Sequence, residues 1–471
     1  MGGSHQRQLP PCAKSPVYVS TGDQALHNAL NSMRNCDGTI VFTEPGARFA
    51  AVDVIYRIYG NLTLDASNIS PGVTLGVDGG RTFTLYGQRG SNNDFFPGLT
   101  AKNVYFSNSR KEMLGQIEGA RMMGNTIIFE NGGTAIFENC RFADNAFTFE
   151  TTGWGAVGGA IMRLQNLTYT RFTDCVVEGN TFNTVANTEA LGFIWIQRPN
   201  GPTVFERCAF RKNRVTGTPG VGATAVYLDS DQVRAQPVSF ASCVFEENEG
   251  RGRAVLTNKG AHVCGAVCSA TSVSRTALDI SFTDCAFRAN RVTGELGAPT
   301  LTANVNALGA AVGLFYGATA TFASCTLTDN AAVNTAVAPG NTANTFAAFG
   351  GAMHLNGVTA TIDSGIFVGN TATGTVEARG GALGVWTSFK RNPSSTTISN
   401  TFFSSNKALA TGAGARTALG GGIATLCLSG ATCRLALVSS GLESNQAMLV
   451  DSTVTSTAVL ARTYAYGFQQ H

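Results

Sequence analysis

The 471-residue sequence predicts an all-β fold, a right-handed parallel β-helix (a solenoid) with a short N-terminal capping helix. Three observations predict it: a nonapeptide recurs six times, its apolar residues have strand-like spacing, and Gly-rich strand-like segments lie between the copies. Repetition with a period of about 20–50 residues is typical of stacked repeat proteins. We expect one elongated body, with an N-terminal segment and capping helix over residues 1–37, a β-helix over 38–450 and a C-terminal rung or cap over 451–471.

The nonapeptide has Cys at its fourth and Asn at its ninth position, with apolar residues at positions one, four and six. Positions four and six share a parity, as alternate residues of a strand do, whereas position one does not, so the chain must bend between one and four. A helix would need the combination of spacings three, four and seven, and this combination is absent. We predict about three strands per repeat, stacked in parallel. The copies are FENCRFADN (137–145), FTDCVVEGN (172–180), FERCAFRKN (205–213), FASCVFEEN (240–248), FTDCAFRAN (282–290) and FASCTLTDN (322–330).

Stacking places equivalent residues of successive coils ~4.8 Å apart. The first-position Phe residues should form an interior stack, each contributing roughly 1.5–3 kcal/mol. Asn at the ninth position tolerates the left-handed backbone of a tight turn, and its amide can bond the Asn above and below. An upstream segment ending at Asn108 fits the same pattern. The predicted Asn ladder is Asn145, Asn180, Asn213, Asn248, Asn290, Asn330, Asn370, Asn406 and Asn445.

The twelve cysteines form two sets. Six occupy the fourth position, where a small apolar side chain fits near a corner; free thiols are preferred there, although disulfides between neighbouring coils stay open. This predicted Cys ladder is Cys140, Cys175, Cys208, Cys243, Cys285 and Cys325. The other six lie in short-range pairs that suit disulfides in an oxidising compartment. These candidate pairs are Cys12 with Cys36, Cys264 with Cys268, and Cys427 with Cys433.

Localisation is expected to be extracellular or at a cell surface. The sequons at Asn61, Asn68 and Asn166 are candidate N-glycosylation sites of such a protein. The opening residues, MGGSHQRQLPPC, are too polar for a signal peptide, so any secretion signal is missing from this segment. His262 precedes Cys264, but no second pair with ligand spacing follows, so neither a metal site nor a cofactor is predicted.

A short helix is expected to cover the N-terminal end of the coil, where strand edges would otherwise be unpaired. Between Thr21 and Cys36, the residues Leu26, Leu30 and Met33 have helical spacing, and Asp23 is the expected N-cap. The Cys12–Cys36 disulfide would hold this helix in place. Counting the looser upstream strands gives about thirteen coils, a rod ~60 Å long.

Two tetrapeptides alternate down the chain, Phe-x-x-Asn and Gly-Gly-Ala-Ile or close variants of it. They occur at 142–145, 210–213, 245–248, 287–290 and 403–406, and at 158–161, 350–353 and 380–383. In this respect, residues from about 99 to 445 resemble the polymorphic outer-membrane protein repeat of chlamydial surface adhesins. The resemblance implies a β-helical passenger at a cell surface, used in adhesion or in a surface layer. No C-terminal membrane barrel follows, which leaves outer-membrane anchoring unsupported.

The expected function is therefore non-catalytic: adhesion, or a structural role in a surface layer or appendage. The partner would be a protein or glycan at a cell surface, or another copy of the chain. A scattered net charge of +3 argues against nucleic acid, and no run of 18 apolar residues suggests a membrane span. The alternative is a polysaccharide lyase or hydrolase, which needs charged side chains gathered on one outward face. The charged candidates are Glu206, Arg211, Lys212, Glu246 and Glu247, and separately Asp229 and Asp231.

Segments of variable length follow each ladder Asn, including 293–306, 331–345 and 408–417. Because the repeat is in phase, we expect them to emerge along one edge of the rod and to form its binding face. His354, which follows a Gly-Gly-Ala-Met stretch, is predicted to point outward and to be structural rather than a ligand.

Overall fold

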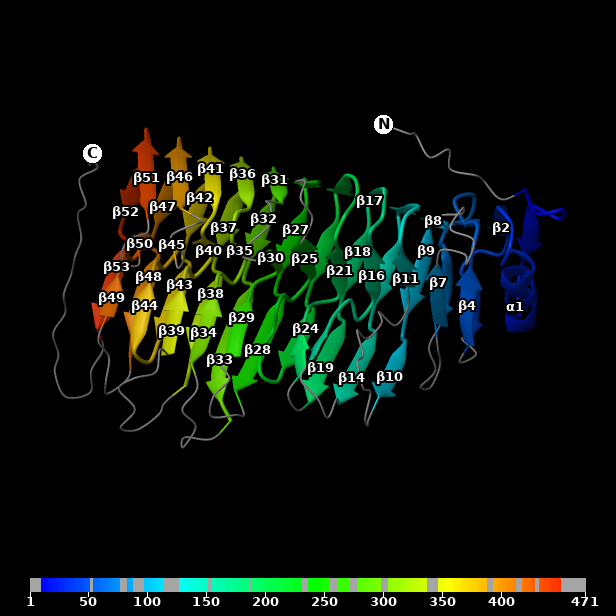
Figure 1. Cartoon of the computed structure of the whole chain (residues 1–471), viewed down its shortest axis with the longest axis horizontal. Helices are drawn as coiled ribbons and strands as arrows, with labels where there is room; N and C mark the ends of the chain where they lie inside the picture. Colours follow the sequence, from blue (N-terminus) through cyan, green and yellow to red (C-terminus); the bar gives the residue numbers. More distant parts are fainter. Residues whose placement is uncertain are drawn as a thin grey trace.

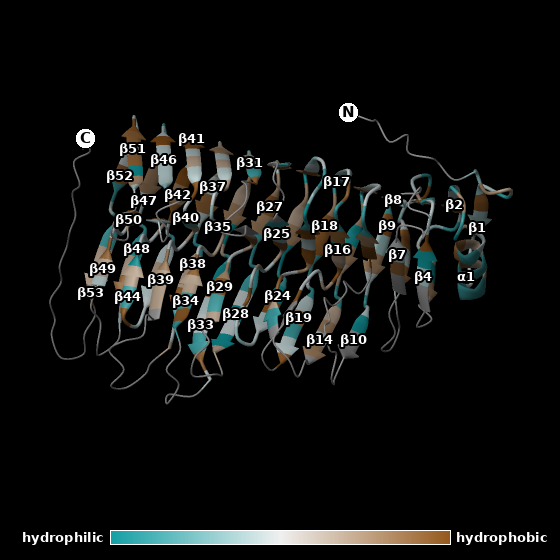
Figure 2. Cartoon of the chain, in the orientation of Figure 1, coloured by the Kyte–Doolittle hydropathy of each residue, from teal (hydrophilic) through white to brown (hydrophobic). Residues whose placement is uncertain are grey.

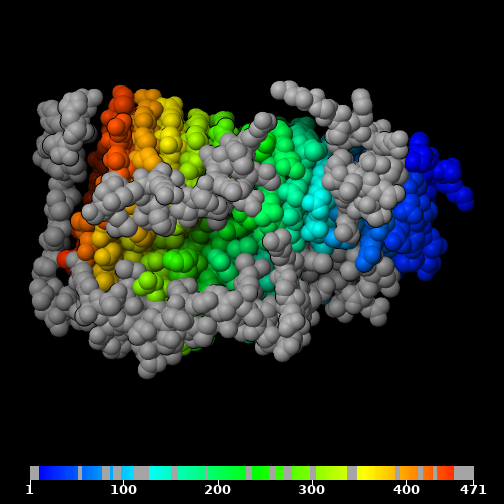
Figure 3. Space-filling view, in the orientation of Figure 1, coloured from blue at the N-terminus to red at the C-terminus, as the bar shows by residue number. Residues whose placement is uncertain are grey.

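The computed structural model describes residues 10–449, except 51–53, 77–82, 88–96, 114–126, 151–154, 186–187, 231–235, 255–260, 272–277, 298–303, 337–345, 388–392, 412–416 and 428–431. The chain winds into a right-handed parallel β-helix with a short helix, α1 (Asp23–Ser32), at one end (Figure 1). Successive coils follow one another in chain order along the rod (Figure 3). The predicted fold class is confirmed.

Each complete coil passes through five parallel sheets, here numbered I to V in chain order. One such coil consists of β36 (Thr319–Ala323) in sheet I, β37 (Thr326–Thr328) in II, β38 (Ala331–Asn334) in III, β39 (Phe346–Phe349) in IV and β40 (Met353–Asn356) in V. The expectation of about three strands per repeat was therefore too low. Two-residue corners separate the strands of sheets I, II and III, and the sheet III strand that follows each ladder Asn had been expected to be loop.

The described strands group as follows. Sheet I contains β1 (Val17–Val19), β2 (Gly38–Phe42), β5 (Asn61–Asp65), β8 (Gly98–Lys102), β12 (Thr134–Glu138), β17 (Tyr169–Thr173), β22 (Thr203–Glu206), β26 (Pro237–Ala241), β31 (Asp279–Thr283), β36, β41 (Thr359–Asp363), β46 (Ser394–Ser399) and β51 (Cys433–Val438). Sheet II contains β3 (Arg48–Ala50), β6 (Val73–Gly76), β9 (Val104–Ser107), β13 (Arg141–Ala143), β18 (Val176–Glu178), β23 (Ala209–Arg211), β27 (Val244–Glu246), β32 (Ala286–Arg288), β37, β42 (Ile366–Val368), β47 (Phe402–Ser404) and β52 (Gly441–Glu443).

Sheet III contains β10 (Arg110–Met113), β14 (Ala146–Glu150), β19 (Thr181–Val185), β24 (Arg214–Gly217), β28 (Glu249–Ala254), β33 (Arg291–Leu296), β38, β43 (Thr371–Gly374), β48 (Lys407–Ala410) and β53 (Gln446–Leu449). Sheet IV contains β29 (Ala261–Cys264), β34 (Val305–Leu308), β39, β44 (Glu377–Arg379) and β49 (Thr417–Leu419), preceded by the pair β15 (Gly155–Val157) and β20 (Thr188–Ala190). Sheet V contains β4 (Val54–Ile58), β7 (Phe83–Gly87), β11 (Ile127–Glu130), β16 (Met162–Gln165), β21 (Ile194–Gln197), β25 (Val226–Ser230), β30 (Val267–Thr271), β35 (Val312–Phe315), β40, β45 (Leu383–Thr387) and β50 (Ile423–Cys427).

The register of sheet I places each nonapeptide directly over the previous one. Phe137 pairs with Phe172, and Phe172 with Phe205, so the repeat is the coil. Sheet I has thirteen strands, which agrees with the number of coils predicted. At ~4.8 Å per strand, the stack is ~60 Å long.

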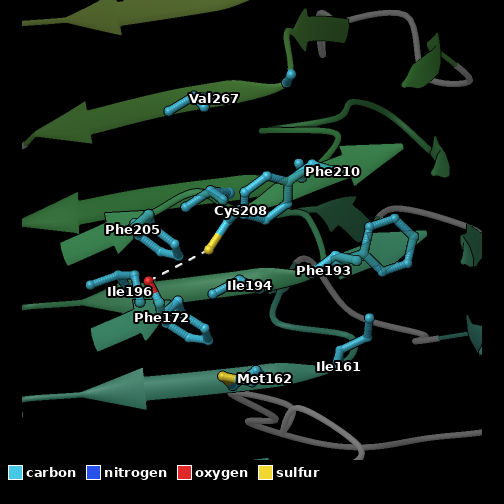
Figure 4. Packing of buried hydrophobic residues seen from close by; sticks show 14 of the residues in the cluster. Ile161, Met162, Phe172, Phe193, Ile194, Ile196, Phe205, Cys208, Phe210 and Val267 are labelled. Carbon is cyan, nitrogen blue, oxygen red and sulfur yellow. Dashed lines mark hydrogen bonds between the residues drawn. The ribbon is translucent and has the colours of Figure 1, made fainter. Parts of the chain in front are cut away.

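Aromatic rings fill the interior as two columns. The first-position rings stack at centroid distances of 4.7–4.9 Å from Phe137 to Phe322. A second column, which the sequence analysis did not predict, forms at the sixth position, where Phe210 and Phe245 stack at 4.7 Å. Edge-to-face contacts join the columns, as between Phe205 and Phe210. Figure 4 shows this packing, and Figure 2 shows hydrophobic residues in coils along the whole rod.

The Asn column forms a continuous hydrogen-bonded ladder. The Asn180 Nδ2 donates to Asn213 Oδ1 at 2.8 Å and to the Phe142 carbonyl oxygen at 3.0 Å. The Asn180 Oδ1 in turn accepts from the Asn145 Nδ2 at 2.9 Å and from its backbone N–H at 3.0 Å. The same Nδ2–Oδ1 bond joins every successive pair down to Asn406 and Asn445. Burial is therefore matched by full use of the amide's polar atoms.

Two details of the ladder differ from expectation. None of the nine ladder residues has a positive φ; the left-handed residues are the third and eighth of the motif, such as Asn139 (φ 51) and Asp144 (φ 57). The upstream copy is also shifted by one residue, because Phe106 pairs with Phe142. Ser109, not Asn108, therefore occupies the ninth position, and its backbone N–H donates to Asn145 Oδ1 at 3.0 Å. Asn108 has φ 59 and matches the eighth position.

The six ladder cysteines are buried free thiols. Each lies within hydrogen-bonding distance of a carbonyl in the preceding coil; Cys208 Sγ, for example, lies 3.5 Å from the Phe172 carbonyl oxygen (Figure 4). Burial raises the pKa of the Cys175 thiol well above its ordinary value, with its neighbours Cys140 and Cys208 adding to the effect. Cys175 therefore behaves as a neutral, apolar residue of the interior.

The N-terminal helix covers the coil as predicted, with Leu26, Leu30 and Met33 buried. Asp23 is not its N-cap. That position is Gly22, with no side-chain cap, and the Asp23 carboxylate instead accepts a hydrogen bond from the Ala50 backbone N–H at 2.6 Å. The segment before the helix is also part of the β-helix, because β1 pairs with β2. The predicted C-terminal rung or cap at 451–471 lies outside the described residues.

Candidate functional site

A pocket lies on the outer side of sheets IV and V, away from the repeating core. Its volume is about 280 Å³, close to the smaller ligand pockets of proteins. Its described lining spans sheet V from β25 to β45, four strand steps or ~19 Å along the rod. The lining residues used below are Glu189, Tyr227, His262, Cys264, Cys268, Asn306, Phe315 and Trp386.

The backbone between sheets IV and V has a nearly constant form. Three residues separate β39 from β40, and the first of them, Gly350, has φ 62. A Cβ on Gly350 would lie 1.9 Å from the Met353 carbonyl oxygen, so the corner requires glycine there. Gly380 repeats this geometry one coil later, with φ 65. The Gly-Gly-Ala motif thus makes the sharp corner beside which the pocket lies.

A disulfide occupies the wall of the pocket at one such corner. Cys264 ends β29 and Cys268 lies in β30, and the two are bonded across the corner. Gly313, the next residue along the sheet V column, makes room for them, since a Cβ there would lie 2.2 Å from Cys264 Sγ. The disulfides Cys12–Cys36 and Cys427–Cys433 are also present, so all three predicted pairs are confirmed.

Aromatic side chains form a second, outer apolar cluster at one end of the pocket. The Trp386 ring lies 4.9 Å from Phe349 and 5.9 Å from His354, and Phe315 lies 5.4 Å from His354. His354 points out of the coil as predicted, but it is fully buried under these rings. Burial lowers its pKa to about 3, so the imidazole is neutral.

The polar lining of the pocket is close to neutral. Burial raises the pKa of Glu189 to about 7, and burial also raises the pKa of Tyr227, with the carboxylates of Glu189 and Asp229 adding to that shift. The described lining residues include no Lys or Arg. The site therefore presents hydroxyl, amide and partly protonated carboxyl groups between aromatic surfaces.

Several buried polar atoms here have no hydrogen-bond partner among the described residues. They include Asn306 Oδ1, Trp386 Nε1 and both ring nitrogens of His354. Asn306 is 6% exposed and makes one long contact, 3.5 Å from its Nδ2 to His262 Nδ1. Unsatisfied buried groups are uncommon and costly, and they mark places where a ligand or water is bound.

The charged residues that the sequence grouped as a candidate catalytic face lie elsewhere, on sheets I and II and the corner after II. They form ion pairs between coils, Arg211 with Glu246 at 3.6 Å and Lys212 with Glu247 at 3.9 Å. Glu206 contacts Arg171 and Arg207, and the Arg171 hydrogen bond is the main reason why its pKa lies below the ordinary value. These carboxylates are partners of basic residues in ion pairs and are not among the described lining residues of the pocket.

Of the second candidate pair, Asp229 lies in β25 beside the pocket and Asp231 lies outside the described residues. No cluster of His, Cys, Asp and Glu suited to a metal ion occurs among the residues that the structure describes. In the same part of the chain, no helix has the length and apolar character to cross a membrane.

The three sequons differ in accessibility. Asn68 is exposed, whereas the Asn61 Nδ2 donates to Asp37 Oδ2 at 3.1 Å and the Asn166 Nδ2 donates to Asn131 Oδ1 at 2.8 Å. Asn166 is also half-buried. Asn68 is therefore the most accessible of the three amides.

The sequence analysis noticed Cys264, Cys268, His262 and His354 but did not bring them together, and it missed Glu189, Asn306 and Trp386. Their residue types change from coil to coil, so the repeat gives no signal for them. The available signal was the clustering of Trp, Tyr and Phe just after the Gly-rich corners. No family model, curated protein or solved structure matches the chain.

Proposed function

We propose that the protein is an extracellular, non-catalytic β-helical rod that attaches to a protein or glycan at a cell surface, or packs in a surface layer. The observation that carries the proposal is a face of constant backbone that is preceded and followed, in chain order, by segments of variable length. Sheets IV and V make this face, and the pocket lies in it. The resemblance to adhesin repeats and the three disulfides support an extracellular location.

The variable segments do not begin where the sequence analysis placed them. Residues 331–334 and 293–296, expected to be loop, belong to strands of sheet III. Variation in length occurs between sheets III and IV, as at 335–345 against 375–376, and again between sheets V and I, as at 388–393 against 357–358. Segments of variable length thus occur at two places in each coil, before sheet IV and after sheet V, rather than at one. Binding surfaces are commonly built from variable segments on a constant scaffold.

The test replaces residues 338–344 with a Gly-Ser linker of equal length, which leaves β38 and β39 intact. We expect attachment of the labelled rod to glycan-coated, protein-coated and cell surfaces to fall. The matched control is Arg211→Ser with Glu246→Ser, which removes an ion pair on sheet II. Equal attachment by both folded variants would contradict a binding role for residues 338–344.

A polysaccharide-active enzyme is the second candidate, and Glu189 is the observation that favours it. A carboxyl with a pKa of about 7 can act as a general acid or base at neutral pH. Incubation with uronic-acid and neutral polysaccharides, followed by measurement of new reducing ends, separates the two functions. Release that disappears in Glu189→Gln would establish catalysis and overturn the binding proposal in its non-catalytic form.

A further inference from the structure

We propose that the pocket on sheets IV and V binds a short, linear, neutral oligosaccharide that lies along the rod axis. This inference rests on the proposed function, because it names the class of ligand that the same face of the rod would bind. It draws on the shape of the pocket, its aromatic surfaces, its charge and its unpartnered polar atoms.

The shape favours an extended ligand. The described lining residues come from five successive sheet V strands, β25, β30, β35, β40 and β45, and from sheet IV beside them. A length of ~19 Å exceeds a single sugar ring and suits a short chain of linked rings. The volume of about 280 Å³ is small for this length, so the pocket is a narrow groove rather than a round cavity.

The chemistry of the lining matches the two surfaces of a sugar ring. A pyranose presents C–H groups on its faces, which pack on aromatic rings, and hydroxyl groups around its edge, which donate and accept hydrogen bonds. Trp386 and Phe315 supply partly exposed aromatic surfaces at one end of the groove, and Tyr227 lies toward the other. Asn306 Oδ1 and Trp386 Nε1 supply one unused acceptor and one unused donor.

Charge decides between neutral and acidic sugars. The described lining includes no Lys or Arg to pair with a carboxylate or sulfate, burial lowers the pKa of the lining residue His262, and Glu189 would repel an acidic group. A ligand that carries hydroxyl or N-acetyl groups leaves no buried charge unpaired. We therefore expect neutral glucan, mannan or chitin fragments to bind and oligogalacturonate not to bind.

The experiment is isothermal titration calorimetry of the full chain with cello-, manno- and chito-oligosaccharides of one to four units, with oligogalacturonate as the acidic comparison. We expect affinity for at least one neutral series to rise with chain length. Trp386→Ala should weaken binding about tenfold, since an aromatic contact of ordinary strength is lost. Asn306→Ala should weaken it about fivefold, with the loss of one hydrogen bond.

The control is Trp195→Ala. Trp195 also lies on the outer side of sheet V, one coil before Tyr227, but it packs under Arg163 at 5.0 Å and is not among the described lining residues. This variant should bind like the unchanged protein. Circular dichroism and thermal melting establish that each variant is folded, and Asn306→Ala provides a second route if Trp386→Ala does not fold.

The outcomes separate the two proposals. If the folded protein binds no neutral oligosaccharide, or if Trp195→Ala weakens binding as much as Trp386→Ala and Asn306→Ala, the inference is overturned. Attachment to cell or protein surfaces without oligosaccharide binding would leave the proposed function standing while the sugar site fails. Oligosaccharide binding without any surface attachment would support the site and contradict the adhesive role.

Discussion

The Asn ladder inside the coil and the residues at the outer groove differ in whether their buried polar atoms have hydrogen-bond partners. In the interior, the amide of Asn180 uses both its nitrogen and its oxygen in hydrogen bonds to neighbouring coils. Beside the groove, His354 is as deeply buried against the lining residues Phe315 and Trp386, yet neither ring nitrogen has a partner among the described residues. The contrast indicates that the Asn ladder is complete by itself, whereas the residues at the groove leave hydrogen-bonding capacity for something else.

The largest expected effect comes from emptying the interior. Phe205→Ala removes a ring that stacks on Phe172 and Phe240 at 4.7 Å and contacts Phe210 from the side. Such a substitution in a close-packed core should lower the free energy of unfolding by about 4 kcal/mol. Denaturant unfolding measures it, with Phe205→Leu as the milder comparison. A loss below that of Phe205→Leu would contradict a tightly packed interior.

Breaking the ladder should have the next largest effect. Asn180→Ala removes the acceptor of the buried Asn145 backbone N–H and the side-chain donor to the Phe142 carbonyl oxygen, which should lower the free energy of unfolding by about 3 kcal/mol. The matched control is Asn183→Ala, an exposed amide in the same coil. Equal stability of the two variants would show that the ladder contributes little.

A substitution of His354, beside the groove, should instead raise the free energy of unfolding. His354→Phe removes two unpartnered nitrogens and keeps the ring among Phe315, Phe349 and Trp386, so the free energy of unfolding should rise by about 1 kcal/mol at pH 7.5. The pH dependence sharpens this test. Unfolded chains protonate histidine below about pH 6.5, whereas folded His354 resists protonation until about pH 3.

The unchanged protein therefore loses stability at this site as the pH falls from about 6.5 toward 3, by about 1 kcal/mol per pH unit, and the variant does not. Chemical denaturation at pH 7.5, 6 and 5 should show a widening difference between them. A constant difference across that range would mean that His354 is accessible to protons in the folded state.

The thiol column should give the smallest change. Cys208→Ala keeps a small apolar residue at the corner and should cost about 1 kcal/mol or less. Because all six ladder cysteines are buried, they should react with a thiol reagent only after unfolding. Rapid reaction in the native state would show that the corner opens, and Cys208→Ser would then report on it independently.

The interior was predictable because it repeats. The Phe, Cys and Asn positions recur with the parity of strands, and stacking like residues over like requires no other information. The errors arose where one copy departs from the pattern. Asn108 was aligned by residue type, whereas the register follows the side chain that fills the interior, Phe106, and this places Ser109 in the ladder.

The groove was not predictable in the same way. Its residues lie on outward positions, where each coil uses a different side chain; the lining residues Tyr227 and Cys268, for example, are followed in the same column by Gly313 and His354. No pattern in a single sequence marks them as neighbours, because only the register of sheets IV and V brings them together. The left-handed positions were likewise misplaced, since Asn is a common choice for them and the chain uses Asp144 and Lys212 there instead.

The constant corner between sheets IV and V has a consequence for how such a protein can change over time. Insertions between sheets III and IV, or between V and I, do not alter the strand pairing on either side, so the coil absorbs them without a shift in register. New binding preferences can thus arise one coil at a time, while the neighbouring coils keep folding as before. The rod is a framework on which recognition can diversify independently of stability.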